Sequence, residues 1–185
     1  MVLPQTVFFP HHLLPLHIFE PRYRTMLQQA LEGSRMFAVT SLSRPSYHSP
    51  HIGGLGLIRS CVLQPDGTSN LVLQGLARVR LDHLLQTSPF IIASPEPVED
   101  SEPSTPGTIA TQEALVAKIL ERIENIENPA GPSFEDVKKF IRHLENYHAF
   151  VDLIGGCFLR DPKIRQTVLQ TTSLTERLRL LLHSL

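Results

Sequence analysis

The spacing of the apolar residues changes about halfway along this chain. Between Ala77 and Asp82 apolar and polar residues alternate, which is typical of a β-strand with one buried face. Beyond Gly107 apolar residues recur every three or four positions, which is typical of amphipathic helices. The segment Ser94–Gly107 contains four prolines and four acidic residues, a composition that favours an extended linker. We therefore predict an α+β fold in two parts joined by a linker. The predicted boundaries are 1–97 for a β subdomain, 98–107 for the linker and 108–185 for a helical bundle.

About six short strands are expected in the first part, from β-propensity and the positions of turn residues. They are Leu3–Phe9, Met36–Thr40, Gly53–Leu63, Ser69–Gln74, Ala77–Asp82 and Phe90–Ala93. The second of them is largely apolar, so we expect it in the middle of the sheet. Pro65-Asp66-Gly67 is expected to be a hairpin turn, because proline presets φ and glycine accepts a positive φ. Such short strands, closed by turns, favour a small curled sheet or a partly open barrel.

Two details of this sheet follow from its residues. Alternation places Ala77, Val79 and Leu81 toward the core, and Arg78, Arg80 and Asp82 toward water. Gly53, Gly54 and Gly56 open a strand, which indicates a bulge or a close approach of another backbone. A phosphate-binding loop is the alternative, but the spacing is not G-x-G-x-x-G and no helix start follows.

One helix is expected within the β subdomain, beginning at Pro21 and ending at Gly33. Tyr23 and Leu27 lie on its apolar face. Glu20 and Arg24 are four residues apart in the acid-then-base order, which favours an ion pair. The simplest interpretation of this segment is structural: a helix entry fixed by an ion pair and a buried aromatic ring.

The second part is expected to form a bundle of about five helices. Asp161-Pro162 is a helix start with a capping residue and proline at the first position. Ser173 with Glu176 has the spacing of a capping box, and Ser133 with Asp136 resembles one.

Charge and composition exclude several classes of function. The chain has 185 residues, with 17 basic and 18 acidic side chains. A net charge of −1 argues against a general nucleic-acid or anionic-membrane binder. The N-terminal sequence does not have the pattern of a signal peptide, no apolar run is long enough to span a membrane, and the two distant cysteines are expected as reduced thiols. We therefore expect a cytoplasmic location.

No catalytic, cofactor or metal motif stands out in the chain. The nine histidines lack an H-E-x-x-H or Cys-x-x-Cys companion, and no G-x-S-x-G elbow or phosphate-binding loop is present. We therefore predict a protein without enzymatic activity, cofactor or bound metal.

Three separated segments together resemble the Lon protease N-terminal domain family, across nearly the whole chain. The first is Phe9-Pro10 with Leu14–Arg24, the second is Ile52–Ile58 with Pro65–Gly67 and Gly75–Arg80, and the third is Asp161–Leu169 with Leu174–Leu178. The residues that carry the family motif are Phe19, Glu20, Pro21, Arg22, Tyr23, Arg24, Gly53, Gly56 and Gly75. The chain is also similar to the Lon-like domain of cereblon. The resemblance implies a PUA-like pseudo-barrel with one short helix, followed by a helical bundle, and a role in recognising substrate proteins. It is expected to be the stand-alone form, without the ATPase and Ser-Lys protease domains of full-length Lon.

This resemblance favours a non-catalytic module that binds unfolded or extended polypeptide segments, as an adaptor or a chaperone-like protein. A separate ATPase or protease is a possible partner, whereas a membrane is not expected. An exposed sheet edge is one way to bind such a segment. The loop Ser43–His51 offers Tyr47, His48 and His51 as candidate peptide-binding residues. The alternatives are an RNA-binding PUA-like module that uses Arg78 and Arg80, and a small-molecule pocket.

Overall fold

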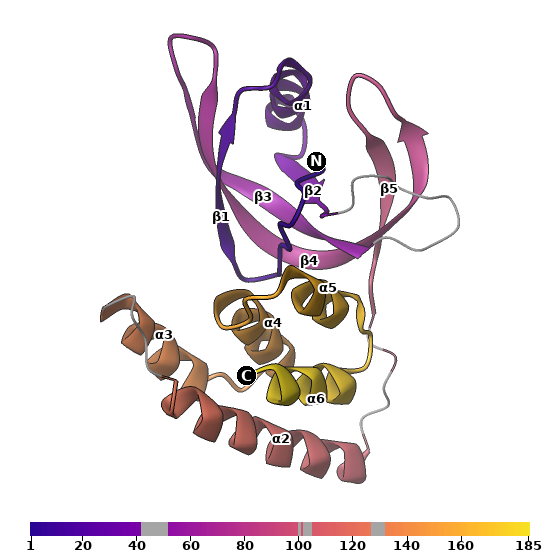
Figure 1. The fold of residues 1–185 in the computed structure, drawn as a ribbon. Helices are drawn as coiled ribbons and strands as arrows, with labels where there is room; N and C mark the ends of the chain where they lie inside the picture. Colours follow the sequence, from indigo (N-terminus) through magenta and orange to yellow (C-terminus); the bar gives the residue numbers. More distant parts are fainter. Residues whose placement is uncertain (42–51, 100, 102–104, 127–131) are drawn as a thin grey trace. The chain divides into compact units, whose positions relative to one another are not determined.

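The computed structural model describes residues 1–41, 52–99, 101, 105–126 and 132–185. These residues form two compact units, Met1–Val98 and Glu99–Leu185, which we call the β unit and the helical unit (Figure 1). The fold is α+β: an antiparallel sheet and one helix form the first unit, and five further described helices form the second.

The β unit contains a five-stranded antiparallel sheet. Its strands are β1 (Leu13–Ile18), β2 (Met36–Val39), β3 (Ile52–Leu63), β4 (Ser69–Gln86) and β5 (Ile92–Pro97). The strand order is β1-β4-β3-β2, and β5 pairs with the far end of the long strand β4. The hairpin between β3 and β4 turns as expected at Gly67, whose φ is +79°. No pairing among the described strands closes this sheet into a barrel.

Several predicted strands differ from the structure. Residues 69–74 and 77–82 belong to one strand, β4, because Gly75 continues it. β2 is the last strand in the order and not a central one, and β5 begins at Ile92 and extends through Pro97 into the predicted linker segment. The prediction of a strand at Leu3–Phe9 is wrong: Val7, Phe8 and Phe9 are buried without forming one. The first named strand is instead Leu13–Ile18, with Pro15 at its centre.

Glycines in β3 and β4 explain how the segment from Val7 to Phe9 is buried. A Cβ atom at Gly54 would overlap the carbonyl oxygen of Phe8, and one at Gly75 would overlap that of Phe9. The expectation of a close backbone approach is therefore confirmed, and register shifts in the β3–β4 pairing show the expected irregularity as well. The segment packs by filling the space that side chains would otherwise occupy.

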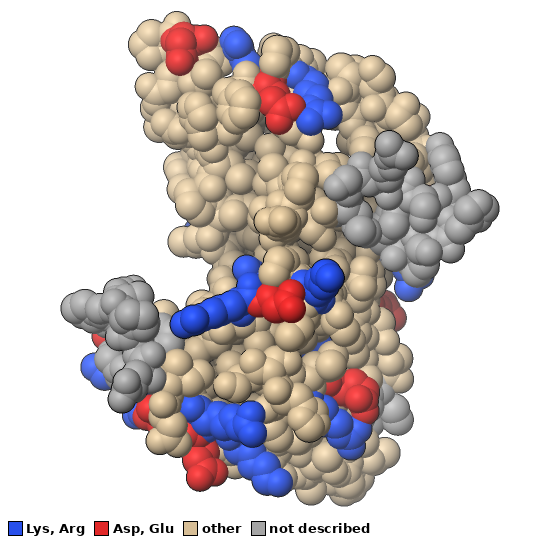
Figure 2. Space-filling view, in the orientation of Figure 1, with Lys and Arg blue, Asp and Glu red and all other residues tan. Residues whose placement is uncertain are grey.

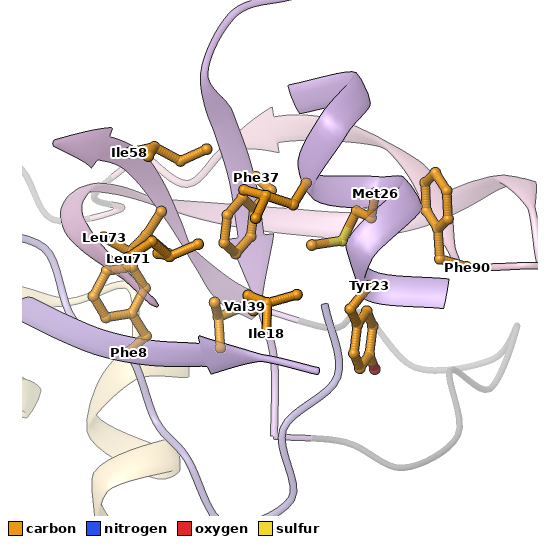
Figure 3. Packing of buried hydrophobic residues seen from close by; sticks show 11 residues of the cluster. Phe8, Ile18, Tyr23, Met26, Phe37, Val39, Ile58, Leu71, Leu73 and Phe90 are labelled. Atoms are coloured by element: carbon orange, nitrogen blue, oxygen red, sulfur yellow. The ribbon is translucent and has the colours of Figure 1, made fainter. Parts of the chain in front are cut away.

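Helix α1 (Pro21–Glu32) packs its apolar face against this sheet. Tyr23, Met26 and Leu27 are its buried residues, and they join a core that includes Phe8, Ile18, Phe37, Leu73 and Phe90 (Figure 3). Proline at the first position suits the helix start, because its missing N–H would have no partner there.

The helical unit contains α2 (Pro106–Glu124), α3 (Pro132–Arg142), α4 (Tyr147–Cys157), α5 (Pro162–Gln170) and α6 (Leu174–Ser184). Caps fix several helix starts. The side chains of Asp161 and Ser173 accept backbone hydrogen bonds from Lys163 and Glu176, at 2.8 and 3.2 Å. Asn146 accepts two more at the start of α4. Strong local signals of this kind made the helices predictable.

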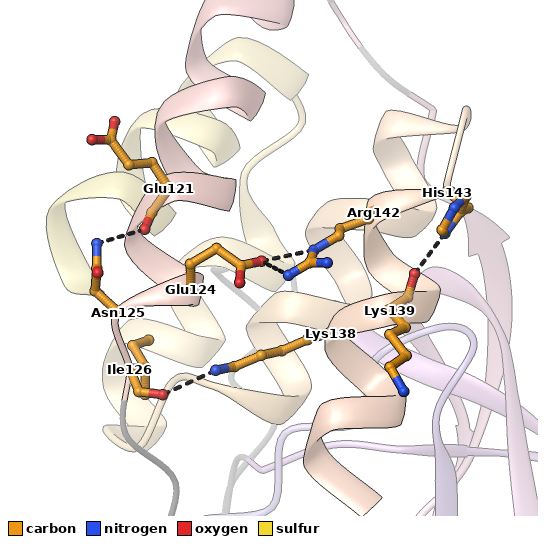
Figure 4. Close-up of polar contacts among 8 residues, drawn as sticks. All are labelled: Glu121, Glu124, Asn125, Ile126, Lys138, Lys139, Arg142 and His143. Atoms are coloured by element: carbon orange, nitrogen blue, oxygen red, sulfur yellow. Dashed lines mark hydrogen bonds and ion pairs between the residues drawn. The ribbon is translucent and has the colours of Figure 1, made fainter.

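A buried ion pair lies at the centre of the helical unit. Arg177 of α6, fully buried, donates to the carboxylate of Asp152 on α4, which is also buried. Two further contacts join α3 to the C-terminal end of α2 (Figure 4). At the surface, Arg142 donates to Glu124 at 2.7 Å. The buried Lys138 donates to the carbonyl of Ile126, just after α2, at 3.1 Å. None of the described helices is both long enough and apolar enough to cross a membrane.

Candidate functional site

A cavity of about 470 Å³ opens in the β unit. One wall is the C-terminal half of α1 with Gly33 and Ser34, and a second is β2. Leu81 and Leu84 of β4 and the segment from Phe90 to Ala93 form the opposite side. No aspartate, glutamate, lysine or arginine is among the described residues that line it. This volume and lining are those of a site for apolar groups.

All three methionines of the chain line this cavity. Met1 lies at its edge, Met26 comes from α1, and Met36 comes from the start of β2. The unbranched thioether side chain adapts to partners of different shape, so methionine is common on surfaces that bind many partners. We refer to this site as the methionine cavity.

Met1 and Val2 line the cavity, and hydrogen bonds fix the N-terminal segment Met1–Leu3. Leu3 donates to the carbonyl of Thr40 at 2.9 Å, and Thr40 donates to that of Met1 at 3.1 Å. The hydroxyl of Tyr23 donates to the carbonyl of Val2 at 3.1 Å. Burial lowers the pKa of the Met1 amino group from 8.0 to about 6. The family-motif residue Tyr23 thus positions part of the cavity wall.

The edges of the sheet offer few places for a further strand. Met1–Leu3 covers the end of β2: the Met1 amino group donates to the carbonyl of Ala38, and a parallel bridge joins Val2 to Thr40 just after the strand. At the end of β5, the N–H of Val98 donates to the carbonyl of Arg78 on β4 at 3.1 Å. Because successive residues of a strand point their N–H groups to opposite sides, the backbone nitrogens of Pro95 and Pro97 face the free edge. Proline has no N–H, so these positions cannot donate to a further strand. β1 carries Pro15. Proline and short covering segments are common ways in which edge strands avoid pairing.

The candidate peptide-binding residues Tyr47, His48 and His51 lie outside the described residues. The motif residues around α1 have clear positions. Glu20 precedes the helix and pairs with Arg22 at 2.8 Å, not with Arg24 as the spacing predicted. This correction arises because Glu20 is outside the helix, so the i,i+4 geometry does not apply. Arg22 also lies over the ring of Tyr23, 4.5 Å from its centroid.

The remaining motif residues have structural surroundings. Phe19 is 60% exposed and stacks on His17, with ring centroids 5.9 Å apart. A Cβ at Gly53 would meet the backbone of Val39 at 2.5 Å, and one at Gly56 would overlap the side chain of Leu73. Gly75 approaches the backbone of Phe9, as described above. The three glycines of the motif thus permit close packing within the β unit.

Arg78 and Arg80 do not form the exposed pair that the alternation predicted. Arg78 is only 7% exposed, so the expectation that it faces water is wrong. Arg80 lies 3.5 Å from Asp82, a neighbouring acidic group on β4. A register shift in the β3–β4 pairing at Leu76, just before Arg78, interrupts strict alternation.

The described histidine, cysteine and acidic residues form no group of three or more that could hold a metal ion. The methionine cavity itself was missed by the sequence analysis. Its residues come from separate segments, and their spacing in the sequence carries no periodic signal. The sequence offers one weak signal for this cavity: the chain has only three methionines, and two of them, Met26 and Met36, flank the end of the predicted helix.

Comparison with known proteins identifies the family. The family model of the ATP-dependent protease La (LON) substrate-binding domain matches residues 1–185. The Lon protease of Dictyoglomus thermophilum is 30% identical over 103 residues, which is 53% of this chain and 13% of that protein. The Lon protease of Flavobacterium johnsoniae is 25% identical over 181 residues, 95% of this chain and 22% of that protein. The chain thus spans a small part of the length of these curated relatives.

Two solved structures show the same fold. The N-terminal domain of the Mycobacterium avium complex Lon protease has a TM-score of 0.77 at 17% identity, covering 99% of this chain and 94% of that one. The Lon N-terminal domain protein from Xanthomonas campestris has a TM-score of 0.64 at 19% identity, covering 98% and 95%. Because the family model covers every residue, the chain belongs to the family of the ATP-dependent protease La (LON) substrate-binding domain.

Proposed function

We propose that this protein binds unfolded or extended polypeptides by taking their apolar side chains into the methionine cavity. The observation that carries this proposal is a cavity of about 470 Å³ with no charged residue in its described lining and with all three methionines around it. Membership of a substrate-binding domain family supports recognition of protein substrates. Burial of apolar surface supplies the free energy, at about 25 cal/mol per Å².

Capture of side chains agrees better with the sheet than addition of a strand does. The edge strands β1 and β5 carry proline, and the N-terminal segment covers the end of β2. A polypeptide therefore gains little from backbone hydrogen bonds there, and selectivity depends on its large apolar residues. The antiparallel sheet of the β unit is proposed to be a PUA-like pseudo-barrel, in which no pairing of the described strands closes the sheet.

The proposal includes no chemical step by this chain. Its role is that of an adaptor or a chaperone-like module which holds a client for an ATPase or protease, on the same or a separate chain. An RNA-binding role has less support, because Arg78 is buried and Arg80 has an acidic neighbour. The two roles differ in salt dependence: phosphate contacts weaken steeply with added salt, whereas apolar capture does not.

Neighbouring leucines of β4 provide the test. Leu84 lines the cavity, whereas Leu85 is 72% exposed and does not line it. We expect Leu84→Gln to weaken the binding of a fluorescently labelled, permanently unfolded polypeptide roughly tenfold, because a glutamine side chain cannot replace the apolar contact. Leu85→Gln should change the affinity less than about twofold. Fluorescence anisotropy gives both dissociation constants.

Circular dichroism of both variants checks that they are folded, and Met36→Gln provides a second cavity substitution at a more exposed position. Equal affinities of the two leucine variants would contradict the cavity as the binding site. Tyr47→Ala tests the separate contribution of the loop Ser43–His51. If only that variant lost affinity, the loop would replace the cavity in this proposal.

A further inference from the structure

A second concave surface lies on the other side of α1. It has a volume of about 870 Å³ and is formed by α1, Arg35 and the β3–β4 hairpin, all within the β unit. The helix separates it from the methionine cavity: Gln29 and Ala30 line the cavity, whereas Gln28 and Leu31 line this groove. We call it the arginine groove, after Arg24 and Arg35 in its wall.

The two arginines of the groove differ from their neighbour Arg22. Arg22 forms an ion pair with Glu20 and lies over the ring of Tyr23, so its charge has partners within the protein. Arg24 and Arg35 have no acidic partner for their side chains among the described residues. The groove contains one carboxylate, Glu32, which accepts a hydrogen bond from Gln28 at 3.1 Å. The groove therefore carries an excess of positive charge.

Local structure fixes the positions of these arginines. The guanidinium group of Arg24 lies where a Cβ of Gly67 would be, so it is placed against the hairpin turn. The backbone of Arg35 has a φ of +59°, an uncommon conformation for a residue with a side chain. Its N–H donates to Ala30 and its carbonyl accepts from Ile58, both at 2.8 Å. An unfavourable local conformation held by two such bonds is typical of functional positions.

The groove also presents apolar surface next to these charges. Leu27 and Leu31 of α1 lie in its wall, and Leu63 at the end of β3 is 73% exposed on its rim. A surface that combines cationic and apolar groups is complementary to a segment with acidic and apolar residues. Nucleic acid would leave Leu63 without an apolar partner.

We infer that the arginine groove binds acidic polypeptide segments that carry a large apolar residue, with Arg24 and Arg35 contacting carboxylates and Leu63 contacting the apolar side chain. This goes beyond capture in the methionine cavity and does not depend on it. On the face of the molecule in Figure 2, few charged side chains lie on the β unit. The first 98 residues contain seven arginines and no lysine.

The test uses two labelled peptides of equal length, one with glutamate around a leucine and one with lysine in place of each glutamate. We expect the wild-type protein to prefer the acidic peptide. Arg24→Gln combined with Arg35→Gln should reduce that affinity about tenfold or more, since charge-assisted hydrogen bonds to carboxylates are lost. Arg22→Gln, on the same helix but outside the groove, should change it less than about twofold.

Two further measurements separate this inference from its alternatives. Leu63→Ser should weaken binding of the acidic peptide, whereas Leu85→Gln, an exposed leucine outside both the cavity and the groove, should leave it unchanged. Equal loss in Arg22→Gln and the double variant would indicate a general charge effect and overturn the inference. Equal binding of both peptides, or tighter binding of a single-stranded oligonucleotide in the groove, would also overturn it.

Discussion

The two units of this protein obtain their internal order in different ways. In the β unit, backbone segments pass directly over Gly54 and Gly75, and an apolar core leaves a cavity on one side of α1 and a groove on the other. In the helical unit, capped helices surround a buried pair of opposite charges. The comparison indicates that the β unit depends on close steric fit and provides concave surfaces. The helical unit depends on capped helix starts and on a buried ion pair between α4 and α6.

The largest expected effect lies in the helical unit. Replacing Asp152 by leucine, or Arg177 by methionine, leaves the other charge buried without its ionic partner. Each single substitution should lower the free energy of unfolding by about 3–5 kcal/mol. The combined variant should lose less than either single variant, because both charges are then replaced by apolar groups. Urea denaturation followed by circular dichroism measures all three.

A second arginine on α6 provides the control. Arg179 pairs with Glu176 at the surface, with about half of each side chain exposed. Arg179→Gln should change the free energy of unfolding by less than about 1 kcal/mol. If the Arg177 and Arg179 variants were equally stable, the buried pair would not organise the helical unit.

The next effect concerns the close fit of the β unit. Gly75→Ala should destabilise it by about 1–3 kcal/mol, because the added methyl group overlaps the backbone of Phe9 and the sheet must shift. Gly107→Ala is the matched change in the helical unit. Its Cβ would make only an ordinary van der Waals contact with the Thr105 hydroxyl, at 4.0 Å, so the substitution should be neutral or stabilising. Hydrogen exchange resolved by residue locates each effect, and an equal response in both units would contradict the comparison.

The same contrast explains which parts of the fold were predictable. Helix starts such as Asp161-Pro162 and Ser173 depend on neighbouring residues, and the structure confirms them. The hairpin turn at Gly67 is equally local. The segment from Val7 to Phe9 was predicted as a strand because its residues favour one. Its burial instead depends on Gly54 and Gly75, which are far away in the sequence.

The candidate sites were less predictable for a related reason. Met1, Met26 and Met36 come together only after the N-terminal segment pairs with β2 and α1 packs on the sheet. The four-residue spacing of Glu20 and Arg24 predicts an ion pair, but Glu20 precedes the first turn of α1 and pairs with Arg22 instead. The true arrangement leaves Arg24 beside the hairpin turn, and no local pattern contains that information.

The smallest expected effect concerns the pKa of one carboxyl group in each unit, Asp66 and Glu124. The backbone N–H and the hydroxyl of Thr68 donate to Asp66 and lower the pKa of its carboxyl, whereas the Arg142 guanidinium lowers that of Glu124. Both pKa values lie below their ordinary values of 3.8 and 4.5. Both ionised groups therefore stabilise the folded state at pH values above these ordinary values. That stability is lost as the pH falls through the folded pKa values.

Added salt should change the pKa values of the two carboxyl groups differently. At about 1 M salt the interaction of Glu124 with a charged partner is screened, so its pKa should rise toward 4.5. The pKa of Asp66 should stay low, because its main donors are uncharged. NMR titration of both carboxyls measures this, with Arg142→Gln raising only the pKa of Glu124. A similar rise of both pKa values with salt would show that the hairpin turn also depends on charge, and the contrast between the units would then be restricted to their interiors.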